Sequence, residues 1–247
     1  MEKVSVVLPV YNGAECLSNA IQSVLSQTYS NLELIIIDDG SNDDSVAIVQ
    51  DFMKKDNRVR LLVNSENKGV SFSRNKGLDN STGDFIAFID ADDEWYFNKL
   101  EVQMDYIRQN KVNWVFSNYK FISEKESYLV KREKGKYSYR DMISNGNPIG
   151  MLTCLIRKDI IGDVRFVNEH HEDYIFWLDI AKKNHCAYNT GDILAIYSAV
   201  FEGISSNKIK SFFWTFKVYL RECQRLGSAI KLQLNYVKNY FSRKNKE

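Results

Sequence analysis

The sequence predicts an α/β protein whose mostly parallel central sheet carries helices on both faces and is followed by a helical C-terminal extension. Two observations support this fold class. Short β-branched runs alternate with helical stretches of ten or more residues, which is the pattern of a parallel sheet built from crossover units. Acidic and other polar residues follow directly after the apolar runs, where such sheets bind ligands.

The first 110 residues show the clearest pattern. We expect strands at 4–8, 33–37, 59–63 and 85–89, helices at 14–27 and 99–109, and a loop entering a helix at 69–80. Pro9 should end the first strand, because proline cannot donate a hydrogen bond to a sheet. After the second strand, Ser41 or Asn42 should cap a further helix. Asp43 and Asp44 would then lie in its first turn, where acidic side chains are favoured.

The chain after residue 110 is less regular. The sequence predicts extended segments at 114–118 and 151–156 and a helix at 172–183. The charged segment 123–138 should form a mobile loop or an exposed hairpin. These expectations leave the connections in the second half of the sheet undefined.

Composition restricts the classes of function. A chain of 247 residues with 44% hydrophobic residues can bury a sizeable core, and its net charge of +1 argues against a nucleic-acid-binding protein. The four cysteines are scattered and form no C-x-x-C pair, so we expect a reducing, cytoplasmic location. The N-terminal apolar run is too short for a signal peptide, and no stretch of eighteen apolar residues predicts a membrane-spanning helix.

The most unusual segment is FIDADDEW, in which four carboxylates follow an apolar run within five positions. Such a group is costly unless a cation lies beside it. Alternate residues at a strand end point to one side, so Asp90 and Asp92 should converge above the sheet. Carboxylate oxygens suit Mg²⁺ or Mn²⁺, which proteins often bind through one or two carboxylates together with substrate phosphates. Taken alone, the D-x-D triplet would favour a solvated acidic turn.

Two other strand ends carry candidate binding residues. Tyr11 could stack on a nucleotide base, and Asp39 could accept a hydrogen bond from it. Alternatively, Tyr11 caps the core and Asp39 belongs to the start of the next helix. The segment NKGVSFSRN places a glycine turn before Arg74, which suits a diphosphate or a ribose but also an ordinary helix start.

Several of these motifs together resemble one family. The stretches VSVVLPVYNGAECLSNAIQSVLSQTYSNLELIIIDDGSNDDS and NKGVSFSRNKGLDNSTGDFIAFIDADDEW are similar, in content and order, to the nucleotide-sugar domain of family 2 glycosyltransferases, which have the GT-A fold. A weaker match continues through GMLTCLIRKDII and EHHEDYIFWLDI to ISSNKIKS. The resemblance implies a GT-A catalytic domain at 1–206, with a nucleotide-sugar half at 1–110 and an acceptor half at 111–206. The basic tail would be 207–247.

The resemblance also implies roles for single residues. Those expected to bind the nucleotide-sugar, usually a UDP-sugar, are Pro9, Tyr11, Asn12, Asp39, Arg74, Asn75, Asp90, Ala91 and Asp92. Asp90 and Asp92 would be the D-x-D pair for Mn²⁺ or Mg²⁺, with Asp92 the direct ligand. Glu172 and Asp173 match the family's E-D motif, with Asp173 as the base of an inverting transfer to a saccharide or lipid-linked acceptor. A helix N-terminus is the alternative for this acidic pair.

Other enzyme classes fit less well. A sugar nucleotidyltransferase should carry a glycine-rich loop after the first strand, which PVYNGAE lacks. A phosphatase similar to haloacid dehalogenases would carry D-x-D-x-[TV] at the first strand. A non-catalytic sugar-nucleotide-binding homologue is a further alternative, although both acidic motifs are intact. Processive members of the family carry a Q-x-x-R-W-type motif, and its absence favours the addition of one sugar per encounter.

The C-terminal segment has its own composition and period. From Lys208 onward it has ten basic and two acidic residues, a net charge of +8, and Lys217, Arg221 and Arg225 form a cationic stripe. A long helix, or a helix pair broken at Gly227, is predicted by apolar residues at Phe213, Phe216, Leu220, Cys223, Ile230, Leu234, Val237 and Phe241. Residues 208–246 could bind an anionic membrane, on the inner face of the plasma membrane. Alternatively, their apolar face packs on the catalytic domain or on a second subunit of a homo-oligomer.

Overall fold

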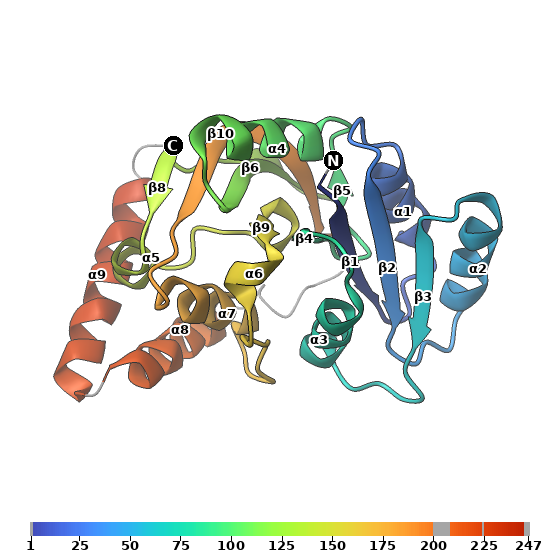
Figure 1. Ribbon diagram of the computed structural model, residues 1–247. Coiled ribbons are helices and arrows are strands. Elements are labelled where there is room, and N and C mark those ends of the chain that lie inside the picture. The colour runs from blue at the N-terminus through green and yellow to red at the C-terminus, as the bar shows by residue number, and fades with distance from the viewer. Residues whose placement is uncertain (1, 200–207, 224, 245–247) are drawn as a thin grey trace.

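The structure is a computed structural model that describes residues 2–199, 208–223 and 225–244. Residues 200–206 of the expected acceptor half, and residues 207, 224 and 245–247 of the expected tail, lie outside the described residues. The strands are β1 (Val4–Val10), β2 (Leu32–Asp38), β3 (Val59–Val63), β4 (Phe85–Phe88), β5 (Glu94–Trp95), β6 (Trp114–Ser123), β7 (Ser127–Val130), β8 (Gly135–Tyr137), β9 (Leu155–Arg157) and β10 (Ala187–Ala199). Within the described chain they form one sheet (Figure 1).

The sheet order is β3-β2-β1-β4-β9-β6-β10-β5, with β7 paired to β6 and β8 paired to β10. The first four strands in this order are parallel, so their carboxyl ends share one rim. Strand β9 runs antiparallel between β4 and β6, while β6 and β10 are again parallel to each other. The expected mostly parallel central sheet is confirmed, and every antiparallel pairing in the described residues involves β6, β9 or β10 from the second half of the chain.

Helices cover both faces of the sheet, as expected (Figure 1). They are α1 (Leu17–Leu25), α2 (Ser45–Lys55), α3 (Val70–Asn80), α4 (Lys99–Asn110), α5 (Tyr139–Asn145), α6 (Lys158–Ile161), α7 (Glu172–Ala181), α8 (Lys208–Glu222) and α9 (Leu226–Lys244). Side chains of α1, α2 and α4 join one buried cluster, and those of α3 and α5 to α9 join the other. Strand β1 serves both clusters because alternate side chains point to opposite faces, with Val6 in one and Val7 in the other.

Two expected boundaries in the first half are wrong. Strand β1 continues through Pro9, because its pairing with β4 stops at Val7 and the missing N–H of proline therefore costs no hydrogen bond to β4. Helix α2 begins at Ser45 rather than directly after Ser41 or Asn42. The hydroxyl of Ser41 instead accepts a hydrogen bond from the Asn12 N–H, so this loop is tied to the end of β1.

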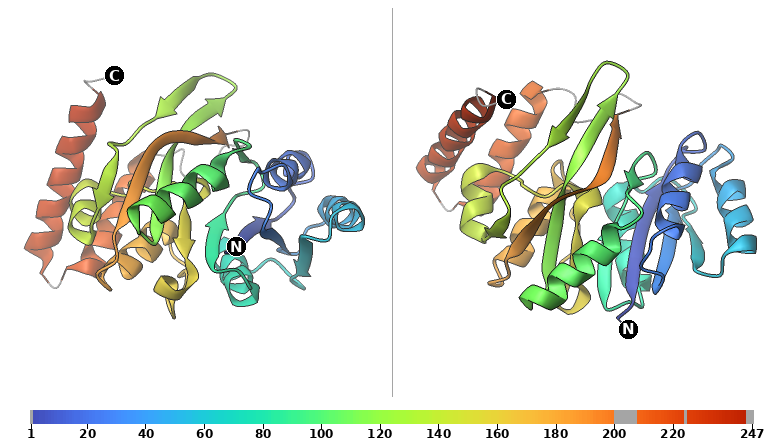
Figure 2. Two further views of the ribbon diagram at one scale, coloured as in Figure 1. Left: turned by 45° about the horizontal axis from the view of Figure 1, so that its top comes forward. Right: turned by 90° about the horizontal axis from the view of Figure 1, so that it is seen from above.

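The second half departs further from the expectations. The charged segment 123–138 is paired rather than a free loop, since β7 forms a hairpin with β6 and β8 pairs antiparallel with β10. The expected strand 151–156 is wrong in part, because residues 151–153 form a 3₁₀ turn before β9 begins at Leu155. Strand β10 has no counterpart in the expectations. The β6–β7 hairpin stands out from the body of the molecule (Figure 2).

The C-terminal helix pair is confirmed, but the break falls between Glu222 and Leu226, and Gly227 lies in the first turn of α9. The buried positions of the pair include Val218, Tyr219 and Ala229, which join the core beside α5 and α7. Much of the predicted apolar face points to solvent instead, as shown by the exposure of Phe213, Leu220, Ile230 and Leu234. No helix in the described residues is both long and apolar enough to cross a membrane.

Candidate active site

The rim formed by the parallel strands is shaped by two neighbouring carboxylates at the end of β2. Asp39 is buried and accepts hydrogen bonds from the Asn64 amide at 2.7 Å and from the N–H groups of Lys68 and Gly69 at 3.1 and 2.8 Å. Asp38 accepts from the N–H groups of residues 40 and 41, while its Oδ1 is buried without a partner. Because a carboxylate offers about four acceptor sites, Asp39 keeps capacity for one more donor.

The end of β1 lies beside this pair, since Val10 and Asp38 are register partners. The side chain of Tyr11 is 48% exposed, as a ring that stacks on a base must be. Asn12 has a φ of 49° and accepts a hydrogen bond from the Asn42 N–H. Pro9 is buried within the strand, so it supports the rim from below.

The acidic segment after β4 contains two carboxyl groups whose pKa values are raised. Burial, followed by the charge of Asp90, raises the pKa of Asp92. Burial raises the pKa of Asp93 well above its usual range, with smaller contributions from Asp90 and Asp92. One oxygen of Asp93 accepts from the Ser198 N–H at 3.2 Å, and the other is buried without a partner. Asp92 and Asp93, which have no ion-pair partner among the described residues, favour an incoming cation beside Asp90.

These residues fit a divalent ion of the magnesium type. Oxygen ligands suit such an ion, and its charge would lower the raised pKa of Asp92 and of Asp93. In the part of the chain that the structure describes, no three His, Cys, Asp or Glu side chains are arranged to hold a metal by themselves. That arrangement suits an ion that proteins hold through one or two carboxylates plus substrate phosphates. Ala91, between Asp90 and Asp92, is partly buried and packs against the core.

Arg74 connects the two acidic motifs. Its side chain is 5% exposed, and its guanidinium donates to Asp90 at 2.8 Å and to Glu172 at 2.8 Å. Burial alone would lower the pKa of Arg74, but the charges of Asp90 and Glu172 outweigh burial and raise it. Sequence reasoning expected this arginine at a ribose or diphosphate. The structure places it between the carboxylates, with Nε buried and without a partner.

Asn75, the neighbour of Arg74, is engaged elsewhere. Its amide nitrogen donates to the Phe166 carbonyl and its amide oxygen accepts from the Phe166 N–H, each at 2.8 Å. Both ends of the side chain therefore fasten α3 to the second half of the chain. The expected contact of Asn75 with the nucleotide-sugar stays a prediction. These two hydrogen bonds to Phe166 argue against it, because they occupy both ends of the Asn75 amide.

The acidic pair Glu172-Asp173 opens α7, preceded by His171 in a left-handed conformation with a φ of 62°. The two interpretations of this pair, a helix N-terminus and a catalytic E-D motif, are therefore compatible, because the pair begins α7 and also lines the cavity. Asp173 accepts hydrogen bonds from the Asn147 amide at 2.8 Å and from the Tyr174 N–H at 2.7 Å. Burial, followed by the charge of Glu172, raises the pKa of Asp173 to about 6. A carboxylate with that pKa is a stronger base than an exposed one and is still ionised at neutral pH.

A single cavity of about 1000 Å³ joins these groups. Its wall includes Arg74, Asp90 and Asp93 from the first half of the chain and Glu172 and Asp173 from the second. The base-binding candidates and Asp92 do not line this cavity. The structure thus brings the E-D motif to the first Asp of the D-x-D motif, while the predicted base site lies on the adjoining rim.

Sequence reasoning missed one wall of the cavity. Four aromatic side chains line it from β6, β7 and β10, with ring centroids 4.7 Å apart for Phe121–Tyr128 and 5.7 Å apart for Phe121–Tyr197. Tyr119 lies two residues before Phe121 on β6 and faces the same cavity, so the i, i+2 spacing was the available signal. His170, left without a role, stacks on Trp214 of α8 with ring centroids 3.9 Å apart.

Solved structures share this architecture. TarS from S. aureus in complex with UDP-GlcNAc matches with a TM-score of 0.74 at 18% identity, covering 97% of this chain and 73% of TarS. The mannosyltransferase PcManGT from Pyrobaculum calidifontis, in complex with GDP-Man and Mn²⁺, matches with a TM-score of 0.72 at 17% identity, covering 97% and 69%. The fold is the GT-A fold of nucleotide-sugar-dependent glycosyltransferases, as expected.

Sequence comparison then gives the family. Residues 5–164 match Glycosyl transferase family 2. The chain is 35% identical over 241 residues, 96% of its length and 91% of the relative's, to WfgD of Escherichia coli, a UDP-Glc:alpha-D-GlcNAc-diphosphoundecaprenol beta-1,3-glucosyltransferase. The chain belongs to Glycosyl transferase family 2 and is a glycosyltransferase. The nucleotidyltransferase, phosphatase and non-catalytic alternatives are therefore set aside.

Proposed function

We propose that this enzyme transfers one sugar from a UDP-sugar to a hydroxyl group of a lipid-linked saccharide, with inversion at the anomeric carbon. The observation that carries the proposal is the cavity in which Asp90 and Asp93 of the strand rim face Asp173 of α7. The names of two similar proteins support the substrates, because WfgD uses UDP-Glc and a diphosphoundecaprenol-linked acceptor and TarS was solved with UDP-GlcNAc.

Asp173 would act as the general base. In the transfer, the acceptor oxygen forms a bond to the anomeric carbon while the bond from that carbon to the diphosphate breaks, and the electron pair leaves with UDP. The proton of the acceptor hydroxyl passes to a carboxylate oxygen of Asp173, which Asn147 and the Tyr174 N–H hold in place. General-base assistance of this kind contributes about 10²–10⁴-fold to the rate.

The rim would bind the sugar donor. Tyr11 offers an exposed ring to the uracil, and Asp39 has one acceptor site left for a base N–H. Asp92 and Asp90 would hold Mn²⁺ or Mg²⁺ together with the diphosphate, and that ion would neutralise the charge that develops on the leaving group. The assignment of 1–110 to the sugar donor and of 111–206 to the acceptor is part of this proposal.

A panel of sugar nucleotides tests the function. The full-length protein should bind and hydrolyse UDP-Glc, UDP-Gal, UDP-GlcNAc or UDP-GalNAc with Mn²⁺, in preference to GDP- or dTDP-sugars. EDTA should abolish transfer, and Mn²⁺ should restore it. Preference for a GDP- or dTDP-sugar would reject the assignment of uracil, and full activity in EDTA would reject the metal site at Asp90 and Asp92.

We also propose that the enzyme is peripheral to the cytoplasmic face of an anionic membrane. The outward face of α8 and α9 carries Phe213, Leu226, Ile230 and Leu234, the last of them 65% exposed. The segment from residue 208 onward has a net charge of +8, so the helices that carry this apolar face are basic in sequence. Such a face suits an anionic bilayer, where each basic residue adds about 1 kcal/mol near the surface.

Vesicle sedimentation tests the membrane proposal. The protein should sediment with vesicles that contain phosphatidylglycerol and not with pure phosphatidylcholine, and the triple change of Leu226, Ile230 and Leu234 to Asn should release it. The matched control changes Met53 and Val63, which are exposed apolar residues on α2 and β3, to Asn and should still sediment. A concentration-dependent dimer without vesicle binding would instead assign this face to a homo-oligomer.

A further inference from the structure

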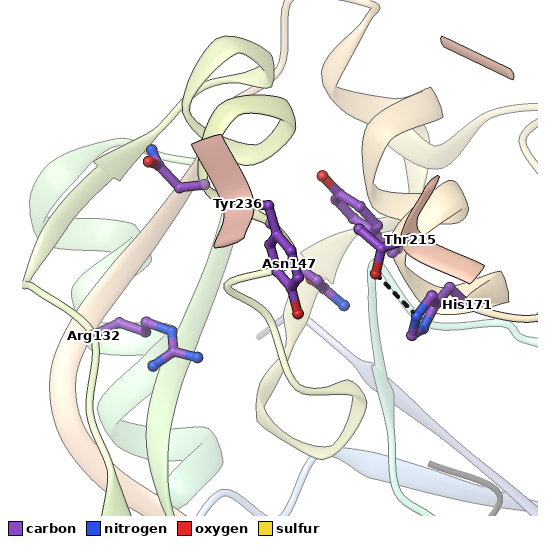
Figure 3. A pocket seen from close by; sticks show the side chains of 8 residues that line it. Arg132, Asn147, His171, Thr215 and Tyr236 are labelled. Atoms are coloured by element: carbon purple, nitrogen blue, oxygen red, sulfur yellow. Dashed lines mark hydrogen bonds between the residues drawn. The ribbon is translucent and has the colours of Figure 1, made fainter. Parts of the chain in front are cut away.

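A second, smaller cavity lies beside the catalytic one and has no role in the function proposed so far. It has a volume of about 250 Å³, and its wall includes Arg132, Asn147, His171, Thr215 and Tyr236 (Figure 3). Arg132, Asn147 and His171 line both cavities, so the two adjoin along these residues. We call the smaller cavity the Arg132 chamber. It is smaller than the roughly 300–1,000 Å³ typical of sites for drug-sized ligands, which suits a single small group.

Arg132 carries a positive charge that the described residues do not balance. No Asp or Glu in the described ranges lies within ion-pair distance of its guanidinium. Its Nη1 donates to the Lys131 carbonyl at 3.1 Å, and its Nε is buried without a partner. This differs from Arg74, which meets two carboxylates. A guanidinium in this state favours an anion that can accept two hydrogen bonds at once.

The rest of the chamber is also suited to an anion. None of the residues that line it is an Asp or a Glu, and several carry N–H or O–H groups. Thr215 and His171 lie together on the side away from Arg132, with Thr215 Oγ1 3.4 Å from His171 Nε2 (Figure 3). Gly146 has a φ of 83°, and a Cβ there would lie 2.9 Å from the Tyr236 ring, so glycine lets the chain pass close to that ring.

The chamber is one side chain away from the proposed base. The amide nitrogen of Asn147 donates to Asp173 Oδ2 at 2.8 Å, and the same asparagine lines the chamber. A molecule with its hydroxyl at Asp173 could therefore place a second group in the chamber. That group would be anionic, because the guanidinium is the only charge of fixed sign in the described lining.

We propose that the Arg132 chamber binds a phosphate group of the acceptor, so that the enzyme selects a phosphorylated saccharide over a neutral one. The identity of the acceptor in this inference rests on the proposed function. The binding of an anion by the chamber is independent of the proposed function. The phosphate could belong to a lipid diphosphate headgroup or to a soluble sugar phosphate. Both present the same oxygens to Arg132, and the experiment distinguishes them.

Binding to the full-length protein saturated with UDP provides the test, since UDP occupies the diphosphate site of the sugar donor. Calorimetric titrations compare N-acetylglucosamine 1-phosphate with N-acetylglucosamine. The phosphate ester should bind more tightly by about tenfold or more, as expected for a charge-assisted contact. Arg132→Gln should remove this preference, and Arg132→Lys should keep part of it because the charge remains without the planar fork. A thermal melt checks that each variant is folded.

The matched control is Lys131→Gln, which removes one positive charge at the exposed neighbouring position and should leave the preference intact. Equal binding of the two sugars by the native protein, or a preference that survives in folded Arg132→Gln, would overturn the proposal. Repeating the comparison with a short-chain lipid diphosphate of the same sugar identifies the source of the phosphate. Hydrolysis of the UDP-sugar, measured in parallel, reports the proposed function separately, because Arg132 lies outside the residues assigned to the sugar donor.

Discussion

The two sides of the cavity are built in different ways. On the adjoining strand rim, backbone supplies most of the donors to two carboxylates, since Asp38 and Asp39 accept from the N–H groups of residues 40, 41, 68 and 69, with the Asn64 amide as a further donor to Asp39. On the opposite side, Asp173 depends on a side chain 26 residues away, Asn147, and the aromatic wall comes from three strands. The rim residues follow directly after their strands in the sequence, whereas the aromatic wall of the acceptor side is assembled from separate strands. Arg74 is the ion-paired link between the two sides.

Asp173→Asn should give the largest effect and should separate the two sides functionally. The variant keeps the shape of the side chain but cannot take the proton, so transfer should fall by about 10²–10⁴-fold. UDP binding should be unchanged, because the residues assigned to the base and diphosphate lie on the rim. Initial rates and calorimetry with UDP measure the two quantities.

The control for this variant is Asp179→Asn on the same helix. Asp179 pairs with Lys182 and Arg221 away from the cavity, so its loss should leave turnover intact. If Asp173→Asn transfers sugar at the normal rate, Asp173 is not the general base. Loss of UDP binding along with transfer would show that the two sides are not separable.

Arg74→Met tests the link between the two sides. Removing the guanidinium leaves Asp90 and Glu172 without their partner in a largely buried site, so the free energy of unfolding should fall by about 3–5 kcal/mol. Urea unfolding monitored by tryptophan fluorescence measures this change.

A second ion pair between the same segments provides the comparison. Arg165 contacts Asp79 of α3 at 2.8 Å, with the arginine side chain 40% exposed, so Arg165→Met should cost only about 0–1 kcal/mol. If the free energy of unfolding falls equally in the two variants, burial does not account for the stabilisation by the Arg74 ion pairs.

Tyr11→Ala tests the rim alone. The exposed ring can stack on the uracil, and a base–aromatic stack contributes about 1–3 kcal/mol. The dissociation constant for UDP should rise accordingly, while the turnover number at saturating UDP-sugar stays the same. Tyr11→Phe keeps the ring and should bind UDP normally. If both variants bind UDP normally, Tyr11 only caps the core.

The same contrast explains what could be predicted from the sequence. The parallel strands and their rim residues were predictable because an apolar run and the polar residues after it are adjacent in the chain, as at Phe88 and Asp90. The role of Arg74 between two carboxylates was not, since Glu172 is 98 residues away. Strand β10 was missed because it interrupts its apolar residues with Asn189, Thr190 and Gly191. The outward apolar face of α9 was predicted as a face, but period alone does not say which side packs on the core.

The pH profile gives the smallest of these effects and addresses the acceptor side. Because burial and Glu172 raise the pKa of Asp173 to about 6, kcat/KM should fall about tenfold per pH unit below pH 6 and level off above it.

The pKa of Asp173 in the folded protein exceeds that of an Asp in the unfolded chain. The contribution of Asp173 to stability is therefore complete below about pH 4 and is lost as the pH rises through 6. Asp173→Asn should therefore be more stable than the native protein at pH 8, with the difference shrinking as the pH falls from about 6 to 4 and constant below that. Activity and stability at this residue should thus change in opposite directions with pH. A native protein that gains stability relative to Asp173→Asn between pH 4 and 8 would show that the pKa of Asp173 is lowered, which would make it a weaker base than an exposed carboxylate.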